Sequence, residues 1–215
     1  MIDARSKFSR DRSRDASPRL EKRILYAGGV SPHKGLHVLL DAFSMVAKEY
    51  PEVRLDVVGL QTSYPLRERE LVESANLFYA CDWISRLKAK FSLAPPDAGT
   101  YLAHLKQRLS AEARKVAFRG FVPRPELVDF YYNADVFAFA PIWDEGFGIP
   151  PVEAMAAGVP VVATRSGAVP ETVKDQQTGF LVSKNDSRAL AEGILKLFHD
   201  DNLRAKMGRC PHLRS

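Results

Sequence analysis

Short apolar runs alternate with longer amphipathic segments along most of the chain, beginning at Arg23. Apolar runs bounded by Gly, Pro or Asp are typical of buried strands, and apolar residues at spacings of three and four are typical of helices with one buried face. The expected strands lie at residues 23–29, 53–59, 115–122, 135–141, 160–164 and 178–186. The expected helices lie at residues 36–50, 125–133 and 187–198, with another beginning at Pro150. This alternation predicts a doubly wound α/β parallel sheet, which binds ligands at the carboxyl ends of its strands.

The segment between Gly59 and Lys115 departs from that plan. It holds more than fifty residues without a strong strand pattern, whereas a strand-to-helix connection needs only a few. Residues 67–91 and 98–115 have helical patterns separated by the breaker at 93–99. We therefore predict an inserted helical hairpin at about 60–115. It either packs over one edge of the sheet or serves as a lid or partner surface.

The two ends of the chain carry no membrane or secretion signal in the sequence. The longest apolar runs, such as residues 154–163, are shorter than the roughly 20 residues of a membrane span. The first twenty residues contain no apolar stretch of the kind that a secretory signal requires. A cytoplasmic protein is expected.

The net charge of +5 is concentrated at the start of the chain. Residues 1–23 contain eight Lys or Arg and four Asp or Glu, and the rest contains 23 against 22. Mixed charge with few aromatics predicts a flexible basic leader at residues 1–22. No nucleic-acid partner is predicted, and peripheral contact with an anionic membrane remains an alternative.

No metal site is predicted. The two cysteines, Cys81 and Cys210, lack metal-ligand spacing and fit a reducing compartment. His33 and His37 are four apart, but no cysteine or carboxylate lies near them in the sequence, so surface positions are favoured.

The stretch AGGVSPHKGLH indicates a binding site for an anion. Gly28 and Gly29 end an expected strand, and Lys34 stands at the mouth of the following helix, where unpaired N–H groups favour anions. A lysine there opposes the helix dipole. That cost is easier to understand if Lys34 faces an anion; an exposed turn lysine is the alternative.

A second motif, DEGFGIPPVE, places Glu145 and Glu153 eight positions apart. The glycines between them let a ligand approach the backbone, and the proline pair is expected to begin a helix with Glu153 in its first turn. Carboxylates repel phosphate but accept hydrogen bonds from sugar hydroxyls. Together with Lys34, the motif fits a nucleotide-linked sugar.

A glycoside hydrolase pair is disfavoured because it has no use for the lysine and helix starts. A structural alternative makes Glu145 a loop salt bridge and Glu153 an acid favourable to the helix dipole.

Residues 23 to about 208 resemble the C-terminal, donor-binding domain of GT-B-fold glycosyltransferases of family 4, also called group 1. The resemblance is carried by RILYAGGVSPHKG, VAFRGFVPRPELVDFYYNADVFAFAP, DEGFGIPPVEAMAAGVPVVATRSGAVPETV and TGFLVSKNDSRALAEGI. It implies a donor site at Gly28, Gly29, Lys34, Gly120, Phe121, Val122, Glu145, Gly146, Phe147, Gly148, Ile149 and Glu153. By the same resemblance, Lys34 binds the diphosphate, Glu145 and residues 146–148 hold the sugar, Glu153 binds the ribose, and the backbone of 120–122 holds the base. Lys34 and Glu145 are the expected catalytic residues.

Such enzymes move a hexose-type sugar from a nucleoside diphosphate to an acceptor hydroxyl, with retained anomeric configuration and no required metal or other cofactor. The sequence does not distinguish UDP, GDP and ADP donors. Many relatives carry arginine five residues before the lysine, where this chain has Gly29. Arg165 is a candidate replacement.

The resemblance also implies a separate N-terminal domain that binds the acceptor, a sugar or lipid-linked saccharide. The 22-residue leader is too short to form it, and residues 209–215 are expected to be a truncated tail. We therefore expect this chain to bind donor but to need that domain, in cis or in trans, for transfer. A non-catalytic nucleotide-sugar-binding module and a nucleotide-sugar epimerase are the alternatives.

Overall fold

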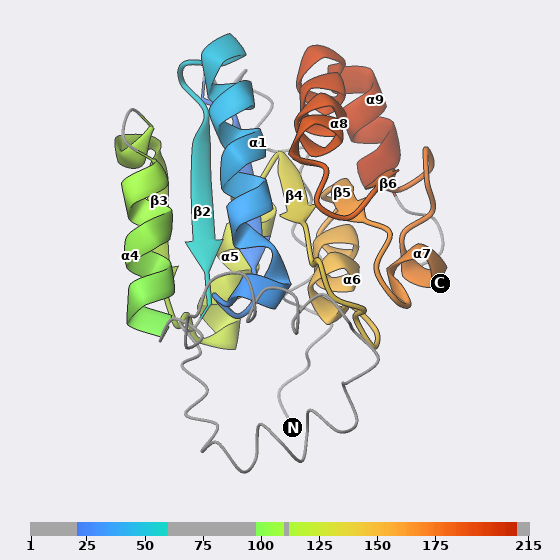
Figure 1. The fold of residues 1–215 in the computed structure, drawn as a ribbon. Helices are drawn as coiled ribbons and strands as arrows, with labels where there is room; N and C mark the ends of the chain where they lie inside the picture. Colours follow the sequence, from blue (N-terminus) through green and yellow to red (C-terminus); the bar gives the residue numbers. More distant parts are fainter. Residues whose placement is uncertain (1–20, 60–97, 110–111, 210–215) are drawn as a thin grey trace.

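The structure is a computed structural model that describes residues 21–59, 98–109 and 112–209, and it contains a six-stranded parallel sheet (Figure 1). The strands are β1 (Arg23–Ala27), β2 (Arg54–Val58), β3 (Val116–Gly120), β4 (Val136–Phe139), β5 (Val161–Thr164) and β6 (Gly179–Val182). Their order, β3-β2-β1-β4-β5-β6, reverses direction between β1 and β4. This confirms the predicted doubly wound sheet and places its switch point at β1 and β4. The arrows of β2 and β4 point down in Figure 1, so the carboxyl edge is the lower one.

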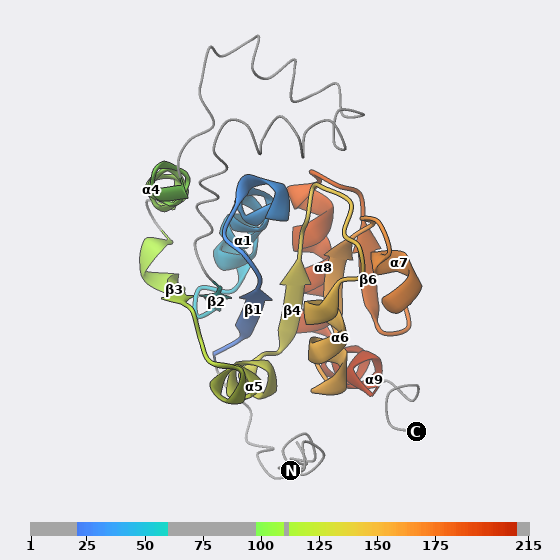
Figure 2. The same ribbon diagram turned by 90° about the horizontal axis from the view of Figure 1, so that it is seen from below.

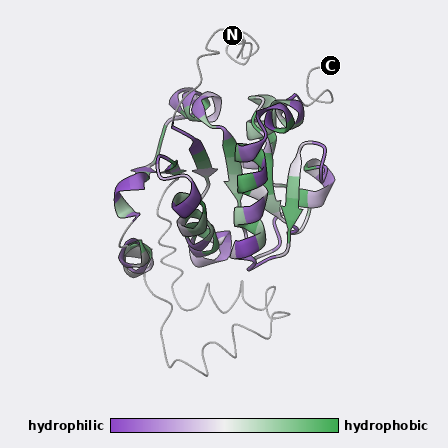
Figure 3. Ribbon diagram, turned by 90° about the horizontal axis from the view of Figure 1, so that it is seen from above, coloured by the Kyte–Doolittle hydropathy of each residue, from purple (hydrophilic) through white to green (hydrophobic). Residues whose placement is uncertain are grey.

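Helices cover both faces of the sheet, as Figure 2 shows for α1 and α5. The first face carries α1 (Leu36–Glu49), α4 (Ala98–Arg108) and α8 (Ser187–His199), and α9 (Asp201–Gly208) follows α8 at the amino edge, where Met207 joins the first core. The second face carries α5 (Arg124–Asn133), α6 (Ile149–Ala156) and α7 (Val169–Thr172). Alternate residues of β1 enter the two cores, with Ile24 and Tyr26 in the first and Leu25 and Ala27 in the second. Figure 3 shows the hydrophobic residues concentrated on the strands between these layers.

The start of one helix differs from the sequence expectation, and two short helices were not expected. Helix α6 begins at Ile149, with Gly148 as its N-cap at φ 76°. The helix therefore begins one residue before the expected Pro150, with the proline pair in its first turn, and Glu153 lies in the second turn rather than in the expected first. Helices α7 and α9 are short and were not expected from the periodicity. Helix α8 begins where the pattern predicted, and Asp186 caps it, because Asp186 Oδ1 accepts the Ala189 N–H at 2.8 Å.

Helix α4 corresponds to part of the second half of the predicted insertion. Leu105 and Leu109 are buried in the first core, and Tyr101 and Leu102 pack against it. This part of the insertion therefore packs against the sheet layer. The predicted first helix and the breaker, within residues 60–97, lie outside the described residues, as do residues 1–20 of the leader and 210–215 of the tail.

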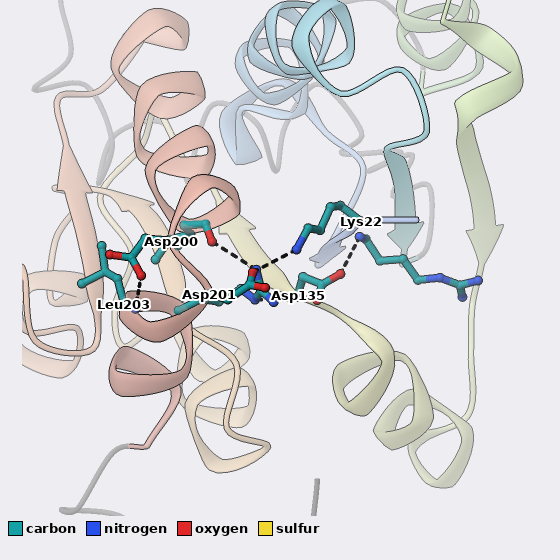
Figure 4. Close-up of polar contacts among 8 residues, drawn as sticks. Lys22, Asp135, Asp200, Asp201 and Leu203 are labelled. Atoms are coloured by element: carbon teal, nitrogen blue, oxygen red, sulfur yellow. Dashed lines mark hydrogen bonds and ion pairs between the residues drawn. The ribbon is translucent and has the colours of Figure 1, made fainter. Parts of the chain in front are cut away.

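Ion pairs at the amino edge of the sheet join the start of β1 to α9 (Figure 4). Lys22 Nζ lies 3.1 Å from Asp201 Oδ1, and the backbone N–H of Arg23 donates to Asp135 Oδ2 at 2.9 Å. Arg204 contacts both Asp135 and Asp201. These contacts fix the end of the sheet opposite to the one where a ligand is expected.

Candidate functional site

A hydrogen bond from a buried tyrosine fixes the loop that follows β1. Tyr26 is 0% exposed, and its hydroxyl donates to the Gly29 carbonyl at 2.8 Å. Burial, with lesser effects of Tyr101 and Glu145, raises the pKa of Tyr26, so its O–H stays a donor. The N–H of Gly28 bonds the Val58 carbonyl at 2.9 Å, which ties the same loop to β2.

Lys34 reaches the switch point because the start of α1 lies against the end of β4. Lys34 ends a 3-10 turn, η2 (Pro32–Lys34), and Gly35 follows as the N-cap of α1 at φ 66°. A Cβ on Gly35 would lie only 1.8 Å from the Ala140 carbonyl oxygen. Glycine is required here both for its positive φ and for this close approach of the two backbones.

The central contact of the site is an ion pair between Lys34 and Glu145. Lys34 Nζ lies 2.6 Å from Glu145 Oε1, and the two side chains are 27% and 13% exposed. The cation that the sequence assigned to an anion therefore binds a carboxylate in this structure. The loop salt bridge considered as an alternative for Glu145 is present, and it joins two residues that are 111 positions apart.

The backbone of Glu145 is fixed by the connection between β5 and α7. The Glu145 N–H donates to Ser166 Oγ at 3.3 Å, and the Glu145 carbonyl accepts the Ala168 N–H at 3.0 Å. A Cβ on Gly167 would lie 2.1 Å from the Glu145 carbonyl oxygen. Sequence reasoning missed Ser166 and Gly167, although Gly167 lies only three residues after a predicted strand at the same edge.

A second lysine supports the same loop. Lys184 Nζ binds Asp144 Oδ1, which also accepts the Gly167 N–H at 2.9 Å. Hydrogen bonds from Lys184 and Gly167 lower the pKa of Asp144. Arg165, the candidate replacement for the arginine absent at Gly29, instead pairs with Asp175 at 2.6 Å.

Glu153 is bound at both of its oxygens. Arg124 Nη2 lies 2.8 Å from Glu153 Oε1, and the Tyr131 hydroxyl donates to Oε2 at 3.0 Å. Arg124 is 82% exposed, whereas Tyr131 is 2% exposed. Burial and the Glu153 carboxylate raise the pKa of Tyr131, so it remains protonated and donates. Sequence reasoning missed Arg124 and Tyr131, although a buried tyrosine hydroxyl usually finds a partner.

Exposed apolar side chains occur at the predicted base and sugar positions. Phe121, Phe147 and Ile149 are 66%, 58% and 57% exposed. Within the described part of the chain only one other large hydrophobic, Met45 at 40%, is classed with them. Ligand sites combine apolar surface with a few placed polar groups, and these side chains supply such surface at the predicted base and sugar positions.

The predicted base-binding segment, residues 120–122, has contacts at its two ends. Gly120 ends β3 at φ 68°, with nothing within 4 Å of a Cβ built there. Its carbonyl accepts the Gly59 N–H at 2.8 Å. Val122 packs against the second core, while Phe121 remains exposed. The backbone of 120–122 is thus anchored on both sides of Phe121.

The described residues contain no group of three or more His, Cys, Asp or Glu side chains placed to hold a metal ion. His33 Nε2 lies 3.3 Å from Ser31 Oγ, and His37 Nδ1 lies 3.0 Å from the Tyr101 hydroxyl, so the two histidines have different partners. Both are partly buried rather than fully exposed. Burial and Lys34 lower the pKa of His33, which favours its neutral form.

A cavity of about 100 Å³ lies against β1, β2 and α5, and its lining includes Arg23, Asp56, Arg119 and Asn133. None of the predicted donor-site residues lines it. Its position also differs from the carboxyl edge at which doubly wound sheets bind ligands, so it is not assigned to this site.

Among the described helices, none is long and apolar enough to cross a membrane.

A doubly wound sheet with Lys34, Glu145 and Glu153 on loops and a helix at its carboxyl edge defines a Rossmann-like domain of the GT-B type. The chain belongs to the family described as glycosyl transferases group 1, whose model matches residues 8–93 and 98–210.

Curated relatives support this assignment. The chain is 33% identical over 185 residues to D-inositol 3-phosphate glycosyltransferase of Streptomyces avermitilis, covering 86% of this chain and 34% of that protein. It is 32% identical over 190 residues to phosphatidyl-myo-inositol mannosyltransferase of Mycobacterium leprae, covering 88% of this chain and 40% of that one. The chain therefore spans about a third to two fifths of the length of these relatives.

Solved structures agree with the fold. HepE of Anabaena, solved with UDP and glucose, is 26% identical with a TM-score of 0.65, covering 88% of this chain and 42% of HepE. The C-terminal domain of the group 1 glycosyltransferase LpcC of Francisella tularensis is also 26% identical, with a TM-score of 0.64. That match covers 87% of this chain and 80% of the LpcC domain.

Proposed function

We propose that this chain binds the nucleoside-diphosphate sugar of a retaining glycosyltransferase that moves a hexose-type sugar to an acceptor hydroxyl. The observation that carries the proposal is the Lys34–Glu145 pair, which unites a cation and a carboxylate at the switch point of the sheet. A sugar linked to a diphosphate offers an anion to the first and hydroxyl donors to the second. The UDP and glucose in the structure of HepE support this chemistry for a relative.

In the proposed complex, Lys34 exchanges Glu145 for the donor diphosphate. Its positive charge then stabilises the negative charge that grows on the diphosphate as the bond to the sugar breaks. Glu145, released from Lys34, accepts hydrogen bonds from the sugar together with the backbone of residues 146–148. Glu153 accepts from the ribose, and the backbone of 120–122 lies along the base. Neither glutamate is required to transfer a proton.

The acceptor is proposed to bind outside this domain. The chain covers 34% of the Streptomyces relative and 42% of HepE, and its predicted donor residues lie along one edge of the sheet. We propose that a further domain, in the same polypeptide or a partner, supplies the acceptor site for a sugar or lipid-linked saccharide, at an anionic membrane surface or in the cytoplasm. Retention predicts that the product keeps the anomeric configuration of the donor, which proton NMR of the early product measures.

The test is calorimetric titration of the full chain with UDP, GDP and ADP and with the matching nucleosides. We expect one diphosphate to bind, and Lys34→Ala to weaken that diphosphate about 10- to 100-fold, the range for hydrogen bonds to charged groups. The nucleoside should lose little, because it has no phosphate. Lys48→Ala, which removes an exposed lysine from the last turn of α1, controls for the change in net charge.

Two results would contradict the proposal. A folded sample that binds none of the nucleotides removes the donor-site assignment. Equal losses of diphosphate and nucleoside affinity in Lys34→Ala remove the phosphate role of Lys34 while leaving a nucleotide site.

A further inference from the structure

The two oxygens of Glu153 have partners of opposite character. Oε2 accepts from Tyr131, whose ring is buried in the second core and packs on Phe137 with ring centroids 5.7 Å apart. Oε1 accepts from Arg124, whose side chain is 82% exposed. One contact of the carboxylate is therefore built into the core, and the other is made by a surface side chain.

These partners differ in how easily they are replaced. An exposed ion pair contributes little because both ions regain water when they separate. A hydrogen bond from a buried hydroxyl to a carboxylate is harder to lose, because each partner would remain desolvated. A ligand that approaches Glu153 thus displaces Arg124 from Oε1 and leaves Tyr131 on Oε2.

We infer that Tyr131 is a positioning residue for ribose recognition: by holding Oε2 of Glu153, it orients Oε1 toward the ribose hydroxyls of the bound nucleotide. The inference rests on the proposed function and adds to it a residue that reaches the nucleotide only through Glu153. Tyr131 comes from the end of α5 and Glu153 from α6, so the hydrogen bond also fixes the two helices at the ribose end.

Tyr26 provides a matched control. Both tyrosines are nearly fully buried, at 0% and 2% exposed, and both hydroxyls donate to groups of the site. Tyr26 donates to the Gly29 carbonyl beside Lys34, whereas Tyr131 donates to Glu153. Removal of either hydroxyl deletes one buried donor, but only Tyr131 lies at the ribose end.

The experiment titrates the full chain with UDP and with 2′,3′-dideoxy-UDP, or with the corresponding GDP or ADP pair if that base binds more tightly. In the unsubstituted chain we expect the ribose form to bind about 10-fold or more tightly, because its hydroxyls donate to a carboxylate. Tyr131→Phe should weaken the ribose form several-fold and leave the dideoxy form within about 2-fold, so that most of the preference is lost. Tyr26→Phe should weaken both forms by the same factor.

The coupling between Tyr131 and the ribose separates a positioning role from a structural one. In a Glu153→Gln background, Tyr131→Phe should cause no further loss of preference. Equal weakening of both nucleotides by Tyr131→Phe, or no weakening, overturns the inference and leaves the proposed function standing. Absence of binding by the unsubstituted chain overturns both.

Arg124→Ala gives a second measurement that remains informative if Tyr131→Phe fails to fold. This change frees Oε1 and leaves Tyr131 in place, so the preference for ribose should be kept or increased. Loss of the preference in Arg124→Ala would show that Arg124, rather than Tyr131, orients the carboxylate, and would overturn the inference.

Discussion

The two ends of the candidate site use the same kind of contact in different settings. At the proposed phosphate and sugar end, Lys34 and Glu145 are 2.6 Å apart and are 27% and 13% exposed. At the proposed ribose end, Arg124 and Glu153 are 2.8 Å apart, but the arginine is 82% exposed. The distances are nearly equal, so burial of the cation is what distinguishes the pairs. The Lys34–Glu145 pair thus joins two partly or mostly buried side chains, while Glu153 has one buried partner, Tyr131, and one exposed partner, Arg124.

The glycines before α1 and α6 also differ in how closely their backbones are packed, and substituting them should show this with the largest effect. Gly35→Ala places a Cβ 1.8 Å from the Ala140 carbonyl oxygen at φ 66°. We expect a loss of about 3 kcal/mol or more in the free energy of unfolding, from overpacking together with left-handed strain. Gly148→Ala has the same kind of φ, but its nearest contact is 3.4 Å from Val169 Cγ2. It should cost only about 1–2 kcal/mol.

Urea unfolding followed by circular dichroism measures both glycine variants. Equal losses for Gly35→Ala and Gly148→Ala would show that strain alone decides, and would remove the claim that the phosphate end depends on close contact between α1 and β4.

The next largest difference should come from deletion of the two cations. Without nucleotide, Lys34→Ala leaves the mostly buried Glu145 carboxylate without this partner, and we expect a loss of about 1–3 kcal/mol. Arg124→Ala should change the free energy of unfolding by less than about 1 kcal/mol, because Glu153 keeps the Tyr131 hydroxyl. Urea unfolding at two salt concentrations measures both changes, and Lys48→Ala serves again as the control. A larger loss for Arg124→Ala would show that burial of the cation does not decide which of the two ion pairs contributes more to stability.

The smallest expected effect concerns pH and the loop that carries Glu145. Lys184 and the Gly167 N–H hold the pKa of Asp144 below its usual value, which is about 3.9. Because the folded-state pKa is below the unfolded one, the stabilisation is complete above the unfolded value and is lost as pH falls through the folded value. Asp144 is 73% exposed, so the contribution should stay below about 1 kcal/mol.

The check is urea unfolding of the unsubstituted chain and of Asp144→Asn between pH 6 and pH 3. The difference between them should be constant at the upper end of this range and shrink toward its lower end. A difference that grows on acidification would mean that Asp144 is stabilised in its protonated form.

The sequence predicted the fold because its signals are local, and it predicted site residues at the ends of the expected strands. Strand and helix patterns specify the doubly wound order, and the carboxyl ends of parallel strands meet at one edge, which brings Lys34 and Glu145 together. Arg165 was proposed as a replacement cation, but it pairs with Asp175. This pairing was not predictable, because it depends on how the connections after β5 and before β6 pack. The hydrogen bond of Tyr131 to Glu153 likewise depends on the packing of α5 against α6. The start of α6 was misplaced by one residue because the proline pair was weighted above the left-handed Gly148 that caps the helix.

The Lys34–Glu145 pair has a consequence for discrimination among anions under the proposed function. Because each residue already satisfies the other, a visiting molecule must compensate both when it separates them. Inorganic phosphate would satisfy Lys34 but leave the largely buried carboxylate facing an anion, and a free sugar would satisfy Glu145 but leave the ammonium group unpaired. A molecule that carries its sugar on its phosphate meets both demands at once. Under the proposed function, the pair would therefore keep abundant cellular phosphate from occupying the site.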